Sequence, residues 1–547
     1  MHLLAGRPLL VALLAAGAAA QTPAFTLDGD ADGDRFGGEV AGAADVDLDG
    51  LSDLLIGAHW NDFNAVHCGQ IKCCSGVDGA LLHVFYGDGL SDRLGVSCNS
   101  GGDVDGDGVP DLLGGAYQGD SGVGYVRAFS GATGAILHTW VGTEFIGQFG
   151  VSVCGPGDLD GDGRGEIVVG ARRMDSSGGV DAGRTFVYRG GTWSVLYVWD
   201  GDSPHDEFGH DTADAGDLDG DGAEDIAVAA WMDDVGGMDA GSVRLLAGAT
   251  GAVLRTLVGE APGDAFGWSI AGCGDIDGDG VPDQVVGAPQ ADPQGDLSGR
   301  AYVVSGADGT FLFSFDGDAP ADAFGYSVAG AGDVDVDGVP DLIVGAFRSD
   351  AGGIGSGMAR LLSGADGHVL ATLPGVTPGD QFGKGVDGAG DSNGDGVDDV
   401  LIGAWSDDTV HGVDSGSATL FRFPVPAFED LGHGLAGGAG VPQLAASGTL
   451  QAGDAVNVTL AGAAPLAPAT LVVGTTVALL PFKGGTLVPA PAALLSGLVT
   501  DAAGALALGG AAPPLPSGTL LVLQAWIVDA GGPAGFAASN GVQHAVP

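Results

Sequence analysis

Short runs of apolar residues alternate with glycine-rich and acidic turns over most of the chain. In the unit that opens with Phe324-Gly325, an alternating run leads into an acidic turn, and an apolar run follows directly. The strands predicted after this turn span residues 342–344, 359–362 and 369–373. Runs of this length and period, bounded by Gly and Asp, are typical of β-strands. The pattern therefore predicts four short antiparallel strands per unit.

This unit occurs seven times along the chain. Each copy opens with a Phe-Gly pair, replaced once by Leu-Gly, and successive pairs lie 55–59 residues apart. The pairs begin at Phe36, Leu94, Phe149, Phe208, Phe266, Phe324 and Phe382. A single small sheet cannot bury both of its faces, whereas four-stranded sheets packed in a ring bury a continuous core. We therefore predict an all-β fold in which residues 22–423 form a seven-bladed β-propeller.

The two ends of the repeat region are complementary. The seventh unit stops after its third strand, around residues 419–423, and an orphan strand at residues 24–28 precedes the first Phe-Gly pair. We predict that this N-terminal strand completes the last blade and closes the ring, which leaves no exposed sheet edge.

Every unit also carries an acidic turn that follows the pattern D-x-D-x-D-G-x-x-D, with Asn or Glu replacing one Asp in two of the turns. Oxygen ligands at alternating positions suit Ca²⁺, and the Gly lets the backbone turn toward the ion. The clustered carboxylates would repel one another without a cation between them. An EF-hand is disfavoured because position twelve is apolar or Gly rather than Glu.

We therefore predict up to seven Ca²⁺ sites, each holding the first hairpin of a blade, while a regulatory role for calcium stays open. The predicted ligands are Asp45, Asp47, Asp49 and Asp53; Asp103, Asp105, Asp107 and Asp111; Asp158, Asp160, Asp162 and Glu166; Asp217, Asp219, Asp221 and Asp225; Asp275, Asp277, Asp279 and Asp283; Asp333, Asp335, Asp337 and Asp341; and Asp391, Asn393, Asp395 and Asp399.

The recurring order of Phe-Gly, acidic turn and Gly-Ala resembles the FG-GAP repeat of integrin α subunits and of many secreted bacterial proteins. Phe324-Gly325 is followed by Gly345-Ala346-Phe347, and the resemblance covers residues 24–423. It implies a seven-bladed propeller with calcium on one face and partner binding on the other. The sequence shows no inserted metal-dependent adhesion domain, no leg region and no GFFKR-type tail, so we do not expect an animal integrin subunit.

The loops after Gly-Ala and before Phe-Gly should share the face opposite calcium. Five aromatic residues enter these loops and are candidate ligand-binding residues: Trp60, Tyr117, Trp231, Phe347 and Trp405. Aromatic side chains on a loop face can anchor a protein or stack on a sugar, although packing between blades is the favoured interpretation of these five. Asp181, Asp239 and Asp414 recur in these loops and are expected to cap turns.

The charge balance narrows the class of partner. The chain has 18 Lys and Arg residues against 71 Asp and Glu, a formal net charge of -53. Phosphate backbones would be repelled, so a nucleic-acid partner is excluded. Disorder is disfavoured because 45% of the residues are hydrophobic.

Residues 1–20 match a secretory signal peptide, with an apolar run before Ala18-Ala19-Ala20, so we expect a secreted or cell-surface protein. No later stretch is expected to span a membrane as a helix, since the least charged one contains Pro465, Pro468 and Pro481. Six cysteines in an exported chain permit disulfides. We expect one bridge among Cys68, Cys73, Cys74 and Cys98, and buried thiols at Cys154 and Cys273.

After Phe423 the charge falls, and alternating apolar strands between Gly/Pro turns predict a small β-sandwich-like domain at residues 426–547. The sequence contains no G-x-S-x-G elbow and no H-E-x-x-H motif, and His205 and His210 are expected to be surface residues. We therefore expect a binding or cell-adhesion module for an extracellular protein or glycan, not an enzyme. The alternatives are a structural cell-surface component and, less favoured, a propeller-type hydrolase.

Overall fold

The computed structural model describes residues 23–118, 122–423, 429–432, 435–436, 441–447, 455–482, 485–501, 503–511, 520–530, 536–539 and 541–545. These residues form strands and turns, with no helix among them. None of this part of the chain therefore supplies a helix long and apolar enough to cross a membrane. The predicted signal peptide lies outside the described residues, and so does the predicted boundary between residues 423 and 426.

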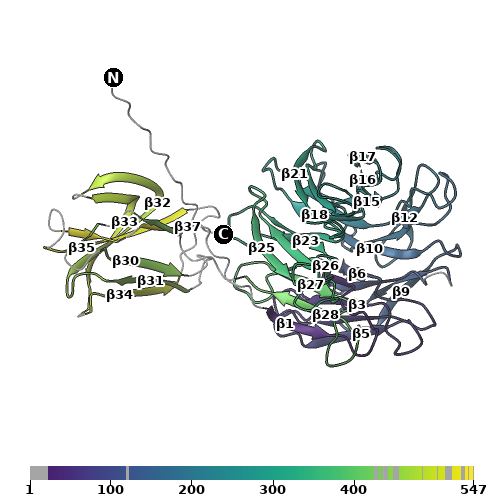
Figure 1. The fold of residues 1–547 in the computed structure, drawn as a ribbon, viewed down its shortest axis with the longest axis horizontal. Helices are drawn as coiled ribbons and strands as arrows, with labels where there is room; N and C mark the ends of the chain where they lie inside the picture. The colour runs from purple at the N-terminus through teal and green to yellow at the C-terminus, as the bar shows by residue number, and fades with distance from the viewer. Residues whose placement is uncertain are drawn as a thin grey trace, which may run out of the picture.

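Within the described residues, seven four-stranded antiparallel sheets form the blades of a propeller (Figure 1). The first three blades comprise β2 (Glu39–Gly42), β3 (Leu54–Ala58), β4 (Gln70–Cys74) and β5 (Leu81–Tyr86); β6 (Ser97–Gly102), β7 (Asp111–Ala116), β8 (Tyr125–Phe129) and β9 (Ile136–Val141); and β10 (Phe149–Gly157), β11 (Glu166–Ala171), β12 (Arg184–Tyr188) and β13 (Val195–Asp200). The next three comprise β14 (Thr212–Gly216), β15 (Asp225–Ala230), β16 (Ser242–Leu246) and β17 (Val253–Val258); β18 (Ser269–Gly274), β19 (Asp283–Ala288), β20 (Arg300–Val304) and β21 (Phe311–Asp316); and β22 (Val328–Gly332), β23 (Asp341–Ala346), β24 (Met358–Leu362) and β25 (Val369–Pro374). The seventh comprises β26 (Phe382–Gly390), β27 (Asp399–Ala404), β28 (Ser417–Phe421) and β1 (Pro23–Asp28).

The first strand of every blade faces the centre of the ring. Each of these strands contacts the first strands of both neighbouring blades, and β26 contacts β2. The second strand is sandwiched between blades, so β23 is buried at every position, as its continuous apolar run predicts. The fourth strand lies outermost, and β25 alternates between exposed and buried residues.

The predicted closure of the ring is confirmed. Strand β1 pairs with β28 in antiparallel register, with Thr26 opposite Thr419 and Leu27 opposite Ala418. The hydroxyl oxygens of Thr26 and Thr419 lie 3.0 Å apart. Purple β1 and green β28, distant in sequence, lie side by side in Figure 1. The ring is thus closed by its two ends rather than by a separate strand.

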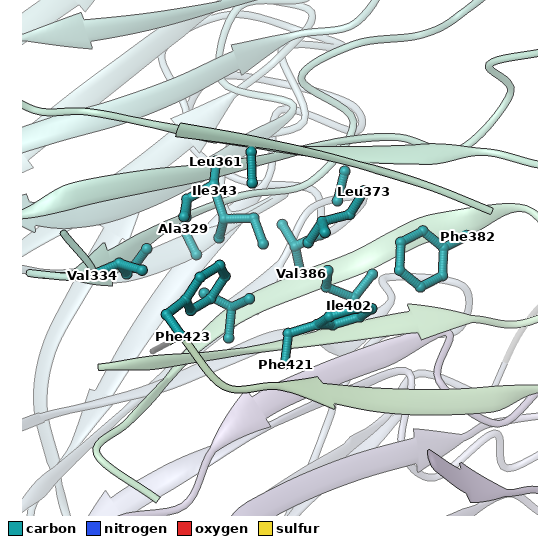
Figure 2. Packing of buried hydrophobic residues seen from close by; sticks show 14 of the residues in the cluster. Ala329, Val334, Ile343, Leu361, Leu373, Phe382, Val386, Ile402, Phe421 and Phe423 are labelled. Atoms are coloured by element: carbon teal, nitrogen blue, oxygen red, sulfur yellow. The ribbon is translucent and has the colours of Figure 1, made fainter. Parts of the chain in front are cut away.

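The apolar core lies between neighbouring blades. Between the sixth and seventh blades, Ile343 and Leu361 belong to the same cluster as Val386, Ile402 and Phe421 (Figure 2). The Phe of the repeat is part of this packing, and Phe324 is fully buried. Apolar burial of this kind, repeated at each boundary between blades, is what single blades cannot achieve alone.

The Gly of the Phe-Gly pair is required by the close approach of two backbones. Gly325 has a φ of +83°, and a Cβ atom at this position would lie 2.3 Å from the carbonyl oxygen of Arg300. Any other L-residue would clash with the neighbouring strand and would adopt a strained backbone conformation. The motif therefore fixes how the chain enters each blade.

The predicted disulfide is wrong, because the structure shows Cys68, Cys73, Cys74 and Cys98 as free and buried thiols. Cys73 and Cys74 are neighbours on β4, so their side chains point to opposite faces and join different apolar clusters. Burial raises the pKa of Cys74 to about 11, which keeps it protonated. The prediction that Cys154 and Cys273 are buried thiols is confirmed.

Beyond the propeller, the described residues form a six-stranded and a three-stranded sheet. The strands are β29 (Glu429–Gly432), β30 (Gln443–Ser447), β31 (Ala455–Ala461), β32 (Pro468–Phe482), β33 (Gly485–Val499), β34 (Leu506–Ala511), β35 (Leu520–Val528), β36 (Phe536–Ala538) and β37 (Gly541–Ala545). Leu444 and Leu460 of the smaller sheet share one apolar cluster with Leu471, Leu523 and Ile527 of the larger sheet.

Candidate metal centres and the mouth of the central channel

The acidic turns join the first and second strands of each blade, so all of them lie at the same end of the blades. In the second blade, the carboxylate of Asp103 accepts hydrogen bonds from the backbone N–H groups of Gly106, Asp107 and Gly108, at 2.6, 3.0 and 2.8 Å. Asp107 in turn accepts the N–H of Val109 at 2.9 Å. These bonds hold the acidic side chains toward the inside of the turn.

The last acid of each turn is buried and ties the turn to the rest of its blade. Asp341 is fully buried, and it accepts the N–H groups of Val334 at 2.8 Å and Gly364 at 3.1 Å. Gly364 lies in the hairpin between the third and fourth strands of the same blade. Burial, reinforced by the charge of Asp335, raises the pKa of Asp341 to about 7. A buried carboxylate beside other acids is costly unless a cation is close by.

The structure brings predicted ligands together in each of the first five turns. In these groups, one oxygen per residue lies within 4.8 Å of the others: Asp45, Asp47 and Asp53; Asp103, Asp105 and Asp111; Asp158, Asp160, Asp162 and Glu166; Asp217, Asp219 and Asp225; and Asp275, Asp277 and Asp279. These groups leave out Asp49, Asp107, Asp221 and Asp283, which belong to the same turns. In the sixth and seventh turns, Asp333 and Asp391 accept backbone N–H groups in the same way.

The donor set fits a hard divalent cation. All side-chain donors are carboxylate oxygens or one amide, which are the ligands that Ca²⁺ takes in proteins. Glu166 Oε1 and Asp399 Oδ1 are buried and have no hydrogen-bond partner within the described part of the chain. Glu166 belongs to the four-acid group of the third turn, so an ion held by that group would lie beside its carboxylate.

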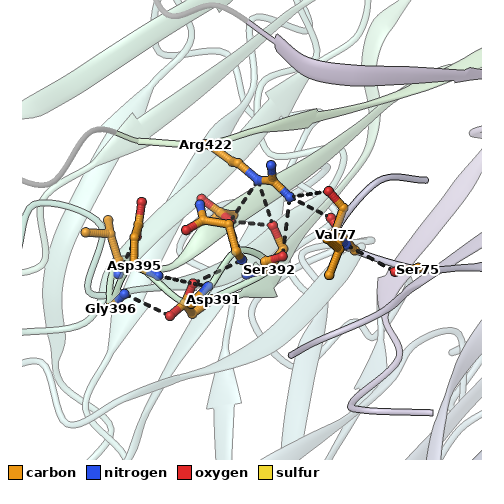
Figure 3. A network of polar contacts seen from close by, with 12 residues as sticks. Ser75, Val77, Asp391, Ser392, Asp395, Gly396 and Arg422 are labelled. Carbon is orange, nitrogen blue, oxygen red and sulfur yellow. Dashed lines mark hydrogen bonds and ion pairs between the residues drawn. The ribbon is translucent and has the colours of Figure 1, made fainter. Parts of the chain in front are cut away.

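In two turns of the described chain, an arginine from outside the turn forms an ion pair with one of the acids. Arg189 forms an ion pair with Asp160 at 2.6 Å. In the seventh blade, Arg422 lies 3.8 Å from Asp399 and donates hydrogen bonds to Ser392 and to the carbonyl oxygens of Gly76 and Val77 (Figure 3). Arg422 thus links the seventh turn to the first blade. The sequence pattern did not indicate either arginine, because neither lies within an acidic turn.

The opposite end of the blades surrounds the mouth of a central channel. The first strands enclose a cavity of about 820 Å³, lined at this end by His59, Tyr117, Arg172, Trp268 and Trp405. In each blade, the first strand runs toward the acidic turn and the second strand runs away from it. The loop before the first strand and the loop after the second strand therefore both lie at the end opposite the acidic turns. The channel mouth is defined below as this opening and the side chains that surround it.

All five predicted aromatic residues belong to the channel mouth. Trp60 lies 4.6 Å from His67, Trp231 lies 4.8 Å from Trp268, and Phe347 lies 4.4 Å from Tyr326, between ring centroids. Tyr117 and Trp405 line the cavity itself. Phe347 is buried, whereas the other four are half-buried, so packing and exposure are combined rather than alternatives.

Cations alternate with these rings around the channel mouth. The guanidinium of Arg35 lies 4.7 Å from the Trp405 ring, and that of Arg93 lies 5.5 Å from the Trp60 ring. The Lys384 ammonium lies 3.7 Å from the Tyr326 ring. The repeat pattern did not indicate these cations, although each directly precedes or follows a Phe-Gly or Leu-Gly pair.

Two smaller predictions for this face need correction. His205 is exposed, as expected, but His210 lines the channel, 4.9 Å from the Trp268 ring, and burial lowers its pKa well below the usual value. Within the described part of the chain, no hydrogen bond shows the Asp239 carboxylate capping its turn; instead the Asp239 N–H donates to Asp234 at 2.8 Å. In the same way, Asp414 donates its N–H to Asp408 and directs its carboxylate to Arg35.

Comparisons with known proteins agree with this geometry. The FG-GAP repeat family matches residues 266–304, which run from a Phe-Gly pair through an acidic turn to the third strand of the fifth blade. The chain carries an FG-GAP β-propeller. Among curated relatives, integrin alpha-V of Gallus gallus is 34% identical over 212 residues, and integrin alpha-IIb of Homo sapiens is 35% identical over 230 residues.

These alignments cover 36% and 38% of this chain, and 20% of each relative. The chain therefore spans about a fifth of the length of the integrins that its FG-GAP propeller resembles. Two solved structures also overlap with it. Hydrazine synthase of Kuenenia stuttgartiensis has a TM-score of 0.44 at 12% identity and covers 73% of this chain and 98% of its own. The Dos1 propeller has a TM-score of 0.38 at 10% identity, with 69% and 77% covered.

Proposed function

We propose that this chain is a secreted, calcium-binding adhesion module whose FG-GAP propeller binds an extracellular protein through the channel mouth. The observation that carries the proposal is the ring of half-buried aromatic and cationic side chains on the face opposite the acidic turns. Half-buried tryptophan, tyrosine and arginine are the residue types that contribute most binding energy at protein interfaces. The similarity to integrin α chains supports a binding module over an enzyme.

In this proposal, calcium has a structural role. Each turn would hold one Ca²⁺ through the acids predicted from the sequence, including those outside the five compact groups. The ion would offset the cost of burial and the repulsion from neighbouring carboxylates, which together raise the pKa of Glu166 and Asp341. Because the last acid of each turn also binds the backbone of its blade, the ion would fix the first hairpin and, through it, the loops of the channel mouth.

The proposed function is tested by binding of the purified chain to arrays of extracellular proteins and glycans, in calcium and in chelator. We expect calcium-dependent binding to a defined protein, and loss of that binding in Trp60→Ala and Trp405→Ala. Phe145→Ala is the matched control, because Phe145 is 60% exposed in a loop before Phe149-Gly150, on the same face. Binding to glycans alone would replace the protein partner with a carbohydrate. Absence of any binding would overturn the proposed function.

A further inference from the structure

Three cations of this acidic protein converge on one side chain at the channel mouth. Arg35, Arg93 and Lys384, from the first, second and seventh blades, lie around His59, whose pKa is lowered by burial and further by the charges of these three groups. Arg35 and Lys384 both lie against the Trp405 ring, at 4.7 and 4.6 Å. Arg35, Arg93, Lys384 and His59 thus form one group, named here the basic sector.

The charge of the basic sector is only partly neutralised by the protein itself. Arg35 forms an ion pair with Asp414 at 3.8 Å. Neither Arg93 nor Lys384 has a carboxylate within ion-pair distance among the residues that the structure describes. Glu39, which also lines the channel, has its pKa raised to about 8 by burial, so it is mostly protonated at neutral pH.

A donor without a partner lies in the same place. Arg93 Nε is buried and has no hydrogen-bond partner in the described part of the chain, and the same holds for His59 Nδ1, which donates only in the tautomer that places the proton on this nitrogen. The Lys384 ammonium lies against the rings of Tyr326, Phe347 and Trp405. Contacts with aromatic rings leave the capacity of an ammonium group to donate to oxygen unused. The basic sector is therefore prepared for an acceptor that carries negative charge.

The surroundings limit the kind of anion that fits. Asp211 and Asp387 line the channel further in, and they would repel an anion that entered more deeply. The net charge of -53 would also repel a polyanion such as an acidic polysaccharide, with one charge on every sugar. A single carboxylate on an otherwise neutral segment avoids both penalties, and guanidinium and ammonium groups bind carboxylates through charge-assisted hydrogen bonds.

We infer that the basic sector, between Arg93 and Lys384, binds the carboxylate of an Asp or Glu side chain on a loop of a partner protein. This inference rests on the proposed function and names the chemistry that the channel mouth selects. The chain's own cations already lie against the rings of Trp60, Tyr326 and Trp405. In this inference the rings therefore hold these cations in position, and they do not bind a cation of the partner.

The probe is a labelled peptide of glycines and serines with one central Asp, compared with the same peptide containing Asn. Binding is measured by fluorescence anisotropy with the full chain in calcium. We expect the Asp peptide to bind at least about tenfold more tightly, the range for a hydrogen bond to a charged group. The preference should fall to about twofold or less in Arg93→Gln/Lys384→Gln. Arg348→Gln is the control for loss of an exposed positive charge outside the basic sector, and it removes one charge where the double variant removes two.

Each outcome decides the inference. Equal affinity for the Asp and Asn peptides, or an unchanged preference in the double variant with a wild-type melting temperature, would overturn it. Tighter binding of tri-galacturonate than of the Asp peptide would also overturn it, in favour of an acidic glycan. If Trp405→Ala abolishes binding on the arrays but the double variant retains it, the carboxylate inference fails and the proposed function stands.

Discussion

A disulfide between the two ends of the propeller would test ring closure directly. The hydroxyl oxygens of Thr26 on β1 and Thr419 on β28 lie 3.0 Å apart, so cysteines at these positions should pair without movement of the backbone. The bond would close a loop of roughly 390 residues, for which chain entropy gives an upper limit of about 6 kcal/mol. For a propeller of this size, that limit corresponds to roughly 7 °C in melting temperature.

The assay compares oxidised and reduced Thr26→Cys/Thr419→Cys by intact mass and by thermal melting. We expect near-complete cross-linking and a higher melting temperature that returns to the wild-type value on reduction. The control is Thr26→Cys with Leu420→Cys, because Leu420 lies opposite Phe25 and points to the other face of the blade. The six native thiols are buried and should not react. Equal cross-linking of both pairs, or none in the first, would refute the closure.

Three further predictions follow from individual residues. Gly325→Ala should lower the free energy of unfolding by about 1–3 kcal/mol in denaturant melts, because φ is positive and the new Cβ would clash with Arg300; an unchanged midpoint would contradict this. Glu39 holds its proton more tightly in the fold, at a pKa of about 8 against 4.5, so wild-type stability should fall between pH 5 and 8. Glu39→Gln should abolish that loss, by about 1–2 kcal/mol because the side chain faces an open channel, and parallel pH profiles would argue against it. Arg422→Ala should destabilise the protein in chelator by about 1–2 kcal/mol but increase the stability that calcium adds, because a cation beside Asp399 is removed; an unchanged or smaller gain in stability from calcium would disprove the reasoning.

Much of the fold could be predicted because the sequence repeats the same pattern of strands and turns along the chain. The Phe-Gly pair at Phe324 recurs with its acidic turn and Gly-Ala in register, so one interpretation is tested seven times along the chain. The missing fourth strand of the last unit and the extra strand at residues 24–28 then imply each other. The geometry of the turns could also be predicted, since spacing alone places the Asp side chains on one side of a tight turn.

The channel mouth could not be predicted in the same way because its chemistry breaks the repeat. Arg35 and Arg93 precede the Phe-Gly position of their blades, where the fifth and sixth blades have Ala265 and Ala323. Only the ring brings these positions together, so their charge is not evident from a single unit. The cysteines show that residues close in sequence need not meet in the fold. Their proximity in sequence suggested a bridge, but Cys73 and Cys74 are directed to different clusters by the alternation of β4.

Counting the calcium ions on the intact chain is the most direct test of the central claim that the acidic turns are metal sites that hold the blades. Native mass spectrometry in calcium and after chelation, with melting curves on the same samples, gives occupancy and stability together. We predict up to seven bound Ca²⁺ ions and a clearly lower melting temperature after chelation. No bound calcium, with identical melting curves in both conditions, would contradict the account.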